Sequence, residues 1–223
     1  MQLIKLVMRQ MARVSSRPLN LILASVLAVV LGFGAATSLS GDGPISFDLS
    51  GRMFLLVSGL AAILGYGFAF PLRTVAKDAS KKTGSLRTLA FARVLSSTLY
   101  GTLFAWLGGL VAMATASVQS GALALPVAAV GFFSVVGPIL LAAAFSGATI
   151  LAGFTANRVV RAVVRWGLFF PGVIALIIFR SGGAASMITS QTLTYTLLIA
   201  ALVCAAEVFF LLQLVPDQQV SVE

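Results

Sequence analysis

The sequence predicts an all-α, polytopic membrane protein with six transmembrane helices, an N-terminal amphipathic interfacial helix and both termini in the cytoplasm. Hydrophobic residues make up 59% of the 223 positions and charged residues 9%, whereas a soluble domain carries about 25% charged residues. Apolar stretches long enough to cross a bilayer follow one another along almost the whole chain. Basic residues gather in alternate connections between these stretches, as in chains that cross a membrane repeatedly.

Residues 1–18 are expected to form the interfacial helix. At about 100° per residue, six apolar residues fall on one side of it: Leu3, Ile4, Val7, Met8, Met11 and Val14. Lys5, Arg9 and Arg13 fall on the opposite side. Such a helix lies in the plane of the membrane interface, with its basic face toward anionic lipid head groups or a cytoplasmic partner.

The transmembrane domain is predicted over residues 19–215, followed by a cytoplasmic tail at 216–223. Its six spans are expected at 19–39, 53–72, 94–116, 122–151, 164–180 and 192–214. The fourth would be about 45 Å long as one helix, against roughly 30 Å of hydrocarbon. We therefore expect it to begin at the outer surface or to kink at Pro138. Small residues four positions apart, such as Ala61 and Gly65, predict close helix contacts.

The distribution of positive charge predicts the orientation. Thirteen of the fifteen Lys and Arg residues fall in three groups: Lys5, Arg9, Arg13 and Arg17; Arg73, Lys77, Lys81, Lys82, Arg87 and Arg93; Arg158, Arg161 and Arg165. Because cytoplasmic loops are enriched in Lys and Arg, these groups are expected on the cytoplasmic side of a bacterial inner (plasma) membrane. The same alternation with apolar spans argues against a nucleic-acid-binding surface, despite the net charge of +9.

Residue types suited to catalysis or metal binding are scarce. The sequence contains no histidine, one cysteine (Cys204), and six acidic residues scattered singly. His-based catalytic dyads and clusters of histidine or thiolate metal ligands are therefore excluded. We expect no catalytic residue, no cofactor and no metal in this chain, and a function other than that of an enzyme.

Glu207 is the one ionisable residue well inside a predicted span. Because charge inside a membrane is costly, it is expected to face protein or water and to have a partner. One interpretation is an ion pair or a hydrogen bond to a neighbouring helix, with Arg161 or Arg165 as the basic partner. The other is a role in proton coupling or substrate binding.

Four aromatic residues inside the spans are possible cavity-lining residues: Tyr66, Trp106, Phe132 and Phe169. Mid-span Trp and Tyr need a partner for their N–H and O–H groups, and a polar cavity is one source of such partners. Ordinary helix packing is the simpler explanation of the same residues, and cavity lining is the alternative.

The connection at 73–93 has the most informative local pattern. Gly84 ends a first basic helical piece, and Ser85 is placed to cap a second one. Leu86 and Leu89, three residues apart, are expected to form an apolar edge at the cytoplasmic surface. The connection is either a charged linker or a docking element for a soluble subunit.

These segments resemble the permeases of ABC-2-type exporters, in particular the small six-helix form typified by the permease of cytochrome c maturation. The family begins with a basic amphipathic interfacial helix, as residues 1–18 do here. Its second cytoplasmic loop carries an acid followed by Gly-[Thr/Ser]-Leu-x-x-Leu, matched by Asp78 and by Gly84 to Leu89. A basic turn then precedes a proline-containing fifth span, matched here by Pro171.

The resemblance implies a permease subunit that works as a dimer with a second permease and with separate ATPase subunits. No G-x-x-x-x-G-K-[ST] motif occurs here, so ATP and Mg would be bound by the partner chain. The coupling loop implied by the resemblance contains Asp78, Lys81, Lys82, Gly84, Ser85, Leu86 and Leu89. Membrane lipid is the other expected partner.

Two other classes of function remain open at the level of the sequence. A secondary transporter or channel subunit would use Glu207 as its coupling group. A non-transporting membrane assembly protein would need neither Glu207 nor an ATPase.

Overall fold

The computed structural model describes residues 2–15, 18–39, 47–69, 85–120, 132–154 and 190–214, together with 158–159, 162–163 and 167. Six α-helices make up almost all of this part of the chain: α1 (Gln2–Ser15), α2 (Pro18–Leu39), α3 (Phe47–Ala69), α5 (Leu86–Ser120), α6 (Phe132–Phe154) and α8 (Ser190–Leu214). The predicted all-α class is confirmed for these residues.

Several of the described helices overlap the predicted spans in sequence. The bounds of α2 and α8 are close to the predicted 19–39 and 192–214, whereas α3 begins before residue 53. Within the predicted span 122–151, α6 begins at Phe132 and continues through Pro138. The predicted span 164–180 and the tail at 216–223 lie outside the described residues.

Three of these helices, α5, α6 and α8, are long and apolar enough to cross a membrane, and α2 and α3 contain shorter apolar helical stretches. With 35 residues, α5 is about 52 Å long at 1.5 Å per residue. That length exceeds the roughly 30 Å of hydrocarbon in a bilayer. The predicted span 94–116 is therefore only the central part of a helix that continues at both ends.

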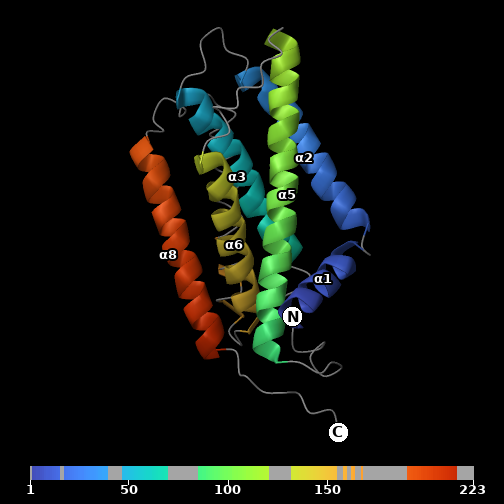
Figure 1. Ribbon diagram of the computed structural model, residues 1–223, viewed down its shortest axis with the longest axis vertical. Coiled ribbons are helices and arrows are strands. Elements are labelled where there is room, and N and C mark those ends of the chain that lie inside the picture. The colour runs from blue at the N-terminus through green and yellow to red at the C-terminus, as the bar shows by residue number, and fades with distance from the viewer. Residues whose placement is uncertain are drawn as a thin grey trace.

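Figure 1 shows the arrangement of the helices. The central helix, α3, packs against α5 and α6, while α2 covers α5 on one side and α8 covers α6 on the other. We call the end at which α5 begins at Leu86 and α8 ends at Leu214 the basal end, which lies at the bottom of Figure 1. There α1 lies beside the first turns of α5 (Figure 1).

Small residues allow the close approach of the central helices. Gly65 of α3 lies between α5 and α6: a Cβ on Gly65 would stand 2.7 Å from the Ala142 carbonyl oxygen, and a Cβ on Gly101 would stand 2.8 Å from the Gly65 nitrogen. At the same crossing, the Ser146 hydroxyl donates a hydrogen bond of 3.1 Å to the Gly65 carbonyl. The predicted role of Ala61 and Gly65 in helix packing is confirmed, since both are buried at these contacts.

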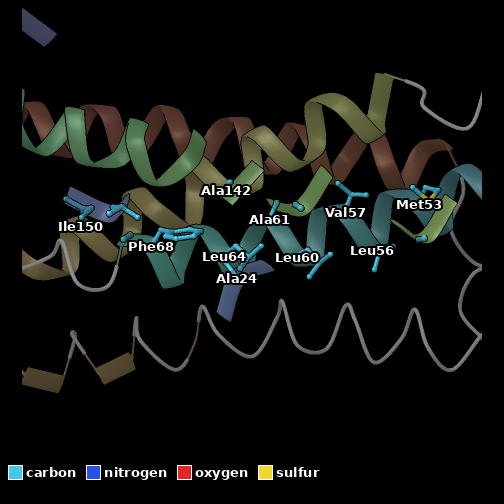
Figure 2. Packing of buried hydrophobic residues seen from close by; sticks show 14 of the residues in the cluster. Ala24, Met53, Leu56, Val57, Leu60, Ala61, Leu64, Phe68, Ala142 and Ile150 are labelled. Carbon is cyan, nitrogen blue, oxygen red and sulfur yellow. The ribbon is translucent and has the colours of Figure 1, made fainter. Parts of the chain in front are cut away.

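A continuous core runs along α3. Figure 2 shows Met53, Leu56, Leu60, Leu64 and Phe68 along this helix, with side chains of neighbouring helices around them. The exterior is also apolar, with exposed large side chains on α2, α5 and α8: Leu19, Ile22, Leu23 and Val26; Leu95, Leu99, Leu103 and Leu107; Leu198, Ile199, Leu202 and Phe209. Water would oppose such a surface and lipid permits it, so the described helices are compatible with a membrane protein.

Candidate functional site

At the basal end, α1 is attached to α5 by one flank. Val7, Gln10 and Val14, spaced by one and two helical turns, are buried. The Tyr100 hydroxyl on α5 donates a hydrogen bond of 3.1 Å to the backbone carbonyl of Met11. A helix that lay only on a lipid surface would bury none of these groups in protein. Here α1 is part of the packed bundle.

The remaining sides of α1 are exposed. Ile4 and Met8 form an exposed apolar flank, and Lys5 and Arg9 are exposed on the basic face. The helix thus meets three surroundings: protein along one flank, an apolar exterior along the next, and charge on the face beyond. This arrangement is the one expected of an interfacial helix. The side chain of Arg13 lies outside the described residues.

The first turn of α5 begins where the sequence predicts. Ser85 directly precedes the helix, and its carbonyl accepts a 3.1 Å hydrogen bond from the Leu89 N–H. Ser85 therefore occupies the predicted N-cap position. The other predicted coupling residues, Asp78, Lys81, Lys82 and Gly84, lie outside the described part of the chain.

The predicted exposed edge of Leu86 and Leu89 is wrong. Leu89 is only 9% exposed, and Leu86 is half-buried and packs against the main core. The reason is that α5 is already inside the bundle in its first turns, where Ala90 and Ala92 are also buried. The leucines stabilise this protein's own fold, and the predicted docking element loses the apolar edge that suggested it.

Arg93 is another residue that the sequence placed in a charged loop and the structure places inside. It is 1% exposed and is the largest fully buried side chain of the described residues. Ser96 and Ser97, its neighbours on the next turn, are also buried, and the Ser96 hydroxyl bonds to the Arg93 carbonyl at 3.0 Å. A buried guanidinium near a helix end is tolerated in an apolar bundle when protein surrounds it.

Arg87 connects the start of α5 to the end of α8. Its guanidinium donates a hydrogen bond of 2.8 Å to the backbone carbonyl of Leu212. The last carbonyls of an α-helix have no partner within the helix, and a cation also interacts favourably with the negative end of the helix dipole. No local sequence pattern indicates this contact, because the two residues are separated by 125 positions.

Glu207 lies on the face of α8 that meets α6. Along this face the side chains follow one another at intervals of three or four residues, and all except the half-buried Cys204 are buried: Leu193, Leu197, Ala200, Cys204, Glu207 and Leu211. This is the spacing of a helix–helix seam. Glu207 is the only acidic or basic residue among these six, and its side chain is 8% exposed. The prediction that Glu207 faces protein is confirmed.

The carboxylate of Glu207 fills the space left by a glycine. Gly147 of α6 stands directly opposite, and a Cβ on Gly147 would overlap Oε2 of Glu207. The backbone of Ala148 hydrogen-bonds to the carboxylate, while Oε1 has no hydrogen-bond partner. The predicted partners Arg161 and Arg165 lie outside the described residues, so the ion pair stays a prediction.

Cys204 lies one turn before Glu207 on the same seam. Its thiol is 3.4 Å from the backbone carbonyl of Leu140 in α6 and is placed to donate to it. Nearer the other end of α8, Leu193 and Leu197 pack with Phe54 of α3. The seam is therefore apolar at the far end and polar at Cys204 and Glu207, with the apolar Leu211 following toward the basal end.

Two of the four predicted cavity-lining residues, Tyr66 and Trp106, have side chains that the structure describes. Trp106 is half-buried and packs against the main core, which favours the packing interpretation, and Tyr66 is half-buried on α3. Phe169 and the side chain of Phe132 lie outside the described residues. An aromatic cluster that was not predicted lies around Phe68. Its ring centroid is 5.2 Å from that of Tyr100 and 5.7 Å from that of Phe104.

The described residues contain no group of three or more His, Cys, Asp or Glu side chains placed to hold a metal ion. Comparisons of this chain with protein-family models, with characterised proteins and with solved structures find no match. The arrangement of the site is therefore the basis for assigning a function.

Proposed function

We propose that this chain is the membrane permease subunit of an ATP-driven ABC exporter in the bacterial inner membrane. It would work as a dimer with a second permease and receive energy from separate ATPase subunits that bind ATP and Mg. The observation that carries this proposal is the attachment of α1 to α5 through the hydrogen bond from Tyr100 to Met11. Tyr100 lies about four turns after Leu86, where α5 begins. The sequence resembles the ATPase-contacting parts of ABC-2-type permeases in α1 and in the segment from Asp78 to Leu89, which leads into α5.

The mechanical consequence of this attachment supports the proposal. A force on α1 would act directly on α5, because the two helices share buried side chains and a hydrogen bond. The contact from Arg87 to Leu212 would carry the same displacement to α8. A partner at the basal end could thus move three helices together, as an exporter driven by a cytoplasmic ATPase requires.

The proposal includes six spans and cytoplasmic termini. The C-terminus of α6 lies toward the basal end, whereas α8 begins at the opposite end of the bundle (Figure 1). This supports a further crossing by the predicted span 164–180. Lys5 and Arg87 lie in the first turns of α1 and α5 at the basal end, and Arg52 lies near the start of α3 at the other end. The positive-inside rule then favours a cytoplasmic basal end.

Purification with native partners tests the proposal. The tagged protein is extracted into lipid-preserving nanodiscs, and the co-purifying chains are identified by mass spectrometry. We expect an ATPase subunit with a Walker A motif in stoichiometric amount, and ATP hydrolysis that vanishes with its Walker lysine changed. Recovery of the intact protein without any ATPase, from cells that express its genomic neighbours, contradicts the proposal.

A secondary transporter is the second candidate, and one observation favours it. Glu207 is a buried acid in a helix long and apolar enough to cross a membrane, and its Oε1 has no hydrogen-bond partner. Transport that stops with a protonophore while cellular ATP is held constant supports this candidate. Transport that follows ATP and ignores the proton gradient supports the exporter.

A further inference from the structure

We propose that Glu207 is a proton-binding site between α6 and α8, occupied by a proton when the two helices are packed as they are here. The carboxyl group sits in the gap at Gly147, and loss of its proton requires α8 to move away from α6. This inference concerns the chemistry of one side chain. It holds for an exporter and for a secondary transporter alike, so its test is independent of the proposed function.

The gap at Gly147 is filled by the carboxyl group of Glu207. Oε2 of Glu207 occupies the position that a side chain on Gly147 would take, so the carboxyl group and the α6 backbone are in direct contact. Oε1 is buried and without a hydrogen-bond partner. No water fits between Gly147 and Oε2, because that space is smaller than a methyl group. Oε2 is therefore in close contact with the α6 backbone, whereas Oε1 lacks a hydrogen-bond partner.

The helices around Glu207 contain few charged residues. The stretch that forms α6 contains no Asp, Glu, Lys, Arg, His, Cys or Tyr, so the facing helix offers no counter-charge. Titratable and basic side chains on α8 itself and on α5, the other helix that α8 touches, comprise Tyr195, Cys204, Arg87, Arg93 and Tyr100. Within the described residues none of them forms an ion pair with Glu207.

These surroundings favour the protonated form of Glu207. An ionised carboxylate removed from water needs a cation or several hydrogen bonds, and without them the group takes up a proton instead. The neutral acid keeps one oxygen that accepts from the Ala148 backbone. It also gains an O–H donor and places no net charge in the apolar seam. The observed packing therefore suits the neutral acid and opposes the carboxylate.

Loss of the proton from Glu207 is expected to accompany a change in the contact between α6 and α8. The described residues offer a carboxylate at this position no counter-charge, so it would need water or a basic partner such as Arg161 or Arg165. Gly147 leaves no room for water beside Oε2 while the seam is closed. Release of the proton to the solvent must therefore accompany separation or rotation of α8. Because Glu207 lies about two turns from the basal end of α8, water has a short path from that end.

Reaction with dicyclohexylcarbodiimide tests the proposal. This lipid-soluble reagent modifies neutral carboxyl groups: the acid O–H adds across one N=C bond, and the acyl group then migrates to nitrogen, giving a stable N-acylurea. The protein in lipid nanodiscs is treated at mildly acidic and mildly alkaline pH and analysed by peptide mass spectrometry. We expect the adduct on Glu207, formed at least tenfold more slowly at the alkaline pH and not formed by a water-soluble carbodiimide.

Two controls keep the result interpretable. Cys204→Ser removes the neighbouring thiol and is expected to leave the labelling unchanged. Glu207→Gln abolishes the adduct, and infrared difference spectra of wild type minus Glu207→Gln should show the C=O stretch of a protonated carboxyl group at neutral pH. That spectrum gives an answer even when the labelled protein is recovered poorly.

Two results overturn the proposal. One is the absence of both the adduct and the infrared band in folded wild-type protein. The other is an adduct that appears only after Arg161→Ala or Arg165→Ala. That outcome would show that Glu207 is an ionised partner of a basic residue.

Discussion

Glu207 of α8 and Gly147 of α6 fit together as a side chain and the gap that receives it. The carboxylate oxygen Oε2 lies where a Cβ on Gly147 would stand, and both residues are buried. The sequence identified Glu207 as unusual because it is an acid inside an apolar run. Gly147 could not be identified in the same way, because nothing in the sequence distinguishes it from the other glycines among the 21 in the chain. The pair leads to the first prediction.

Gly147→Ala is expected to destabilise the fold by about 1–3 kcal/mol, the usual cost of overpacking. The new methyl group overlaps the carboxylate of Glu207 rather than the end of a soft apolar chain. Shortening the acid should relieve the overlap, so Gly147→Ala combined with Glu207→Ala should be less destabilised than the sum of the single variants. Unfolding in mixed micelles measures all three.

Gly67→Ala is the matched control. Gly67 lies in α3 with nothing within 4 Å of the position of its Cβ. Its replacement should be neutral or stabilising by up to about 1 kcal/mol, because alanine is the better helix former. Equal losses of stability at Gly67 and Gly147 would contradict the specific fit with Glu207.

Gly65 carries the second prediction. Its Cβ would approach both the carbonyl oxygen and the Cα of Ala142, and Gly101 is in contact with it from the other side. Backbone atoms cannot turn aside as a flexible side chain can. Gly65→Val should therefore displace α6 or α5 and break the hydrogen bond from Ser146, with a loss of several kcal/mol. Protein yield and thermal unfolding in detergent would show it, and wild-type stability of this variant would argue against the helix crossing.

Arg87 carries the third prediction, which is local. Arg87→Ala removes the hydrogen bond to the Leu212 carbonyl and should cost about 0.5–1.5 kcal/mol, because the contact is exposed to solvent. Hydrogen–deuterium exchange should accelerate in the last turn of α8 and stay unchanged in α2. Arg87→Lys retains the charge and should recover part of the protection. Uniform acceleration through the whole bundle would show that Arg87 acts in some other way.

The helices could be predicted where the sequence changes character sharply. The bounds of α2 and α8 follow from apolar runs that end at polar or turn-forming residues, with Pro18 at the start of α2. The start of α5 follows from the cap at Ser85. These features are local, so a single sequence contains them.

The buried face at the start of α5 could not be predicted in the same way. Leu89 and Arg93 stand in a segment rich in basic residues, which indicates contact with water. In the structure both are buried, because α5 enters the bundle in its first turns beside α1. Whether a basic helical segment lies in water or against another helix depends on contacts distant in the sequence. The residues that form these distant contacts show no local sequence pattern that would identify them.

The burial of Leu89 changes how the proposed ATPase contact must be tested. Leu89→Asp places a charge in the core and should cost at least about 3 kcal/mol, so lost association in that variant would only report lost folding. The exposed basic face of α1 avoids this difficulty. Lys5 and Arg9 are exposed and belong to a helix anchored by its opposite flank.

The fourth prediction is that Lys5→Glu with Arg9→Glu abolishes retention of the ATPase subunit while the protein still folds and inserts. Exposed substitutions change stability by about 0.5 kcal/mol or less, whereas opposite charge at a docking surface slows encounter and weakens the complex. Co-purification and ATP hydrolysis are measured at equal membrane abundance. Lys5→Arg with Arg9→Lys keeps the charge and should behave as wild type. Full retention of the ATPase by the charge-reversed protein would remove α1 from the proposed contact and leave the predicted coupling residues, among them Lys81 and Lys82, to account for it.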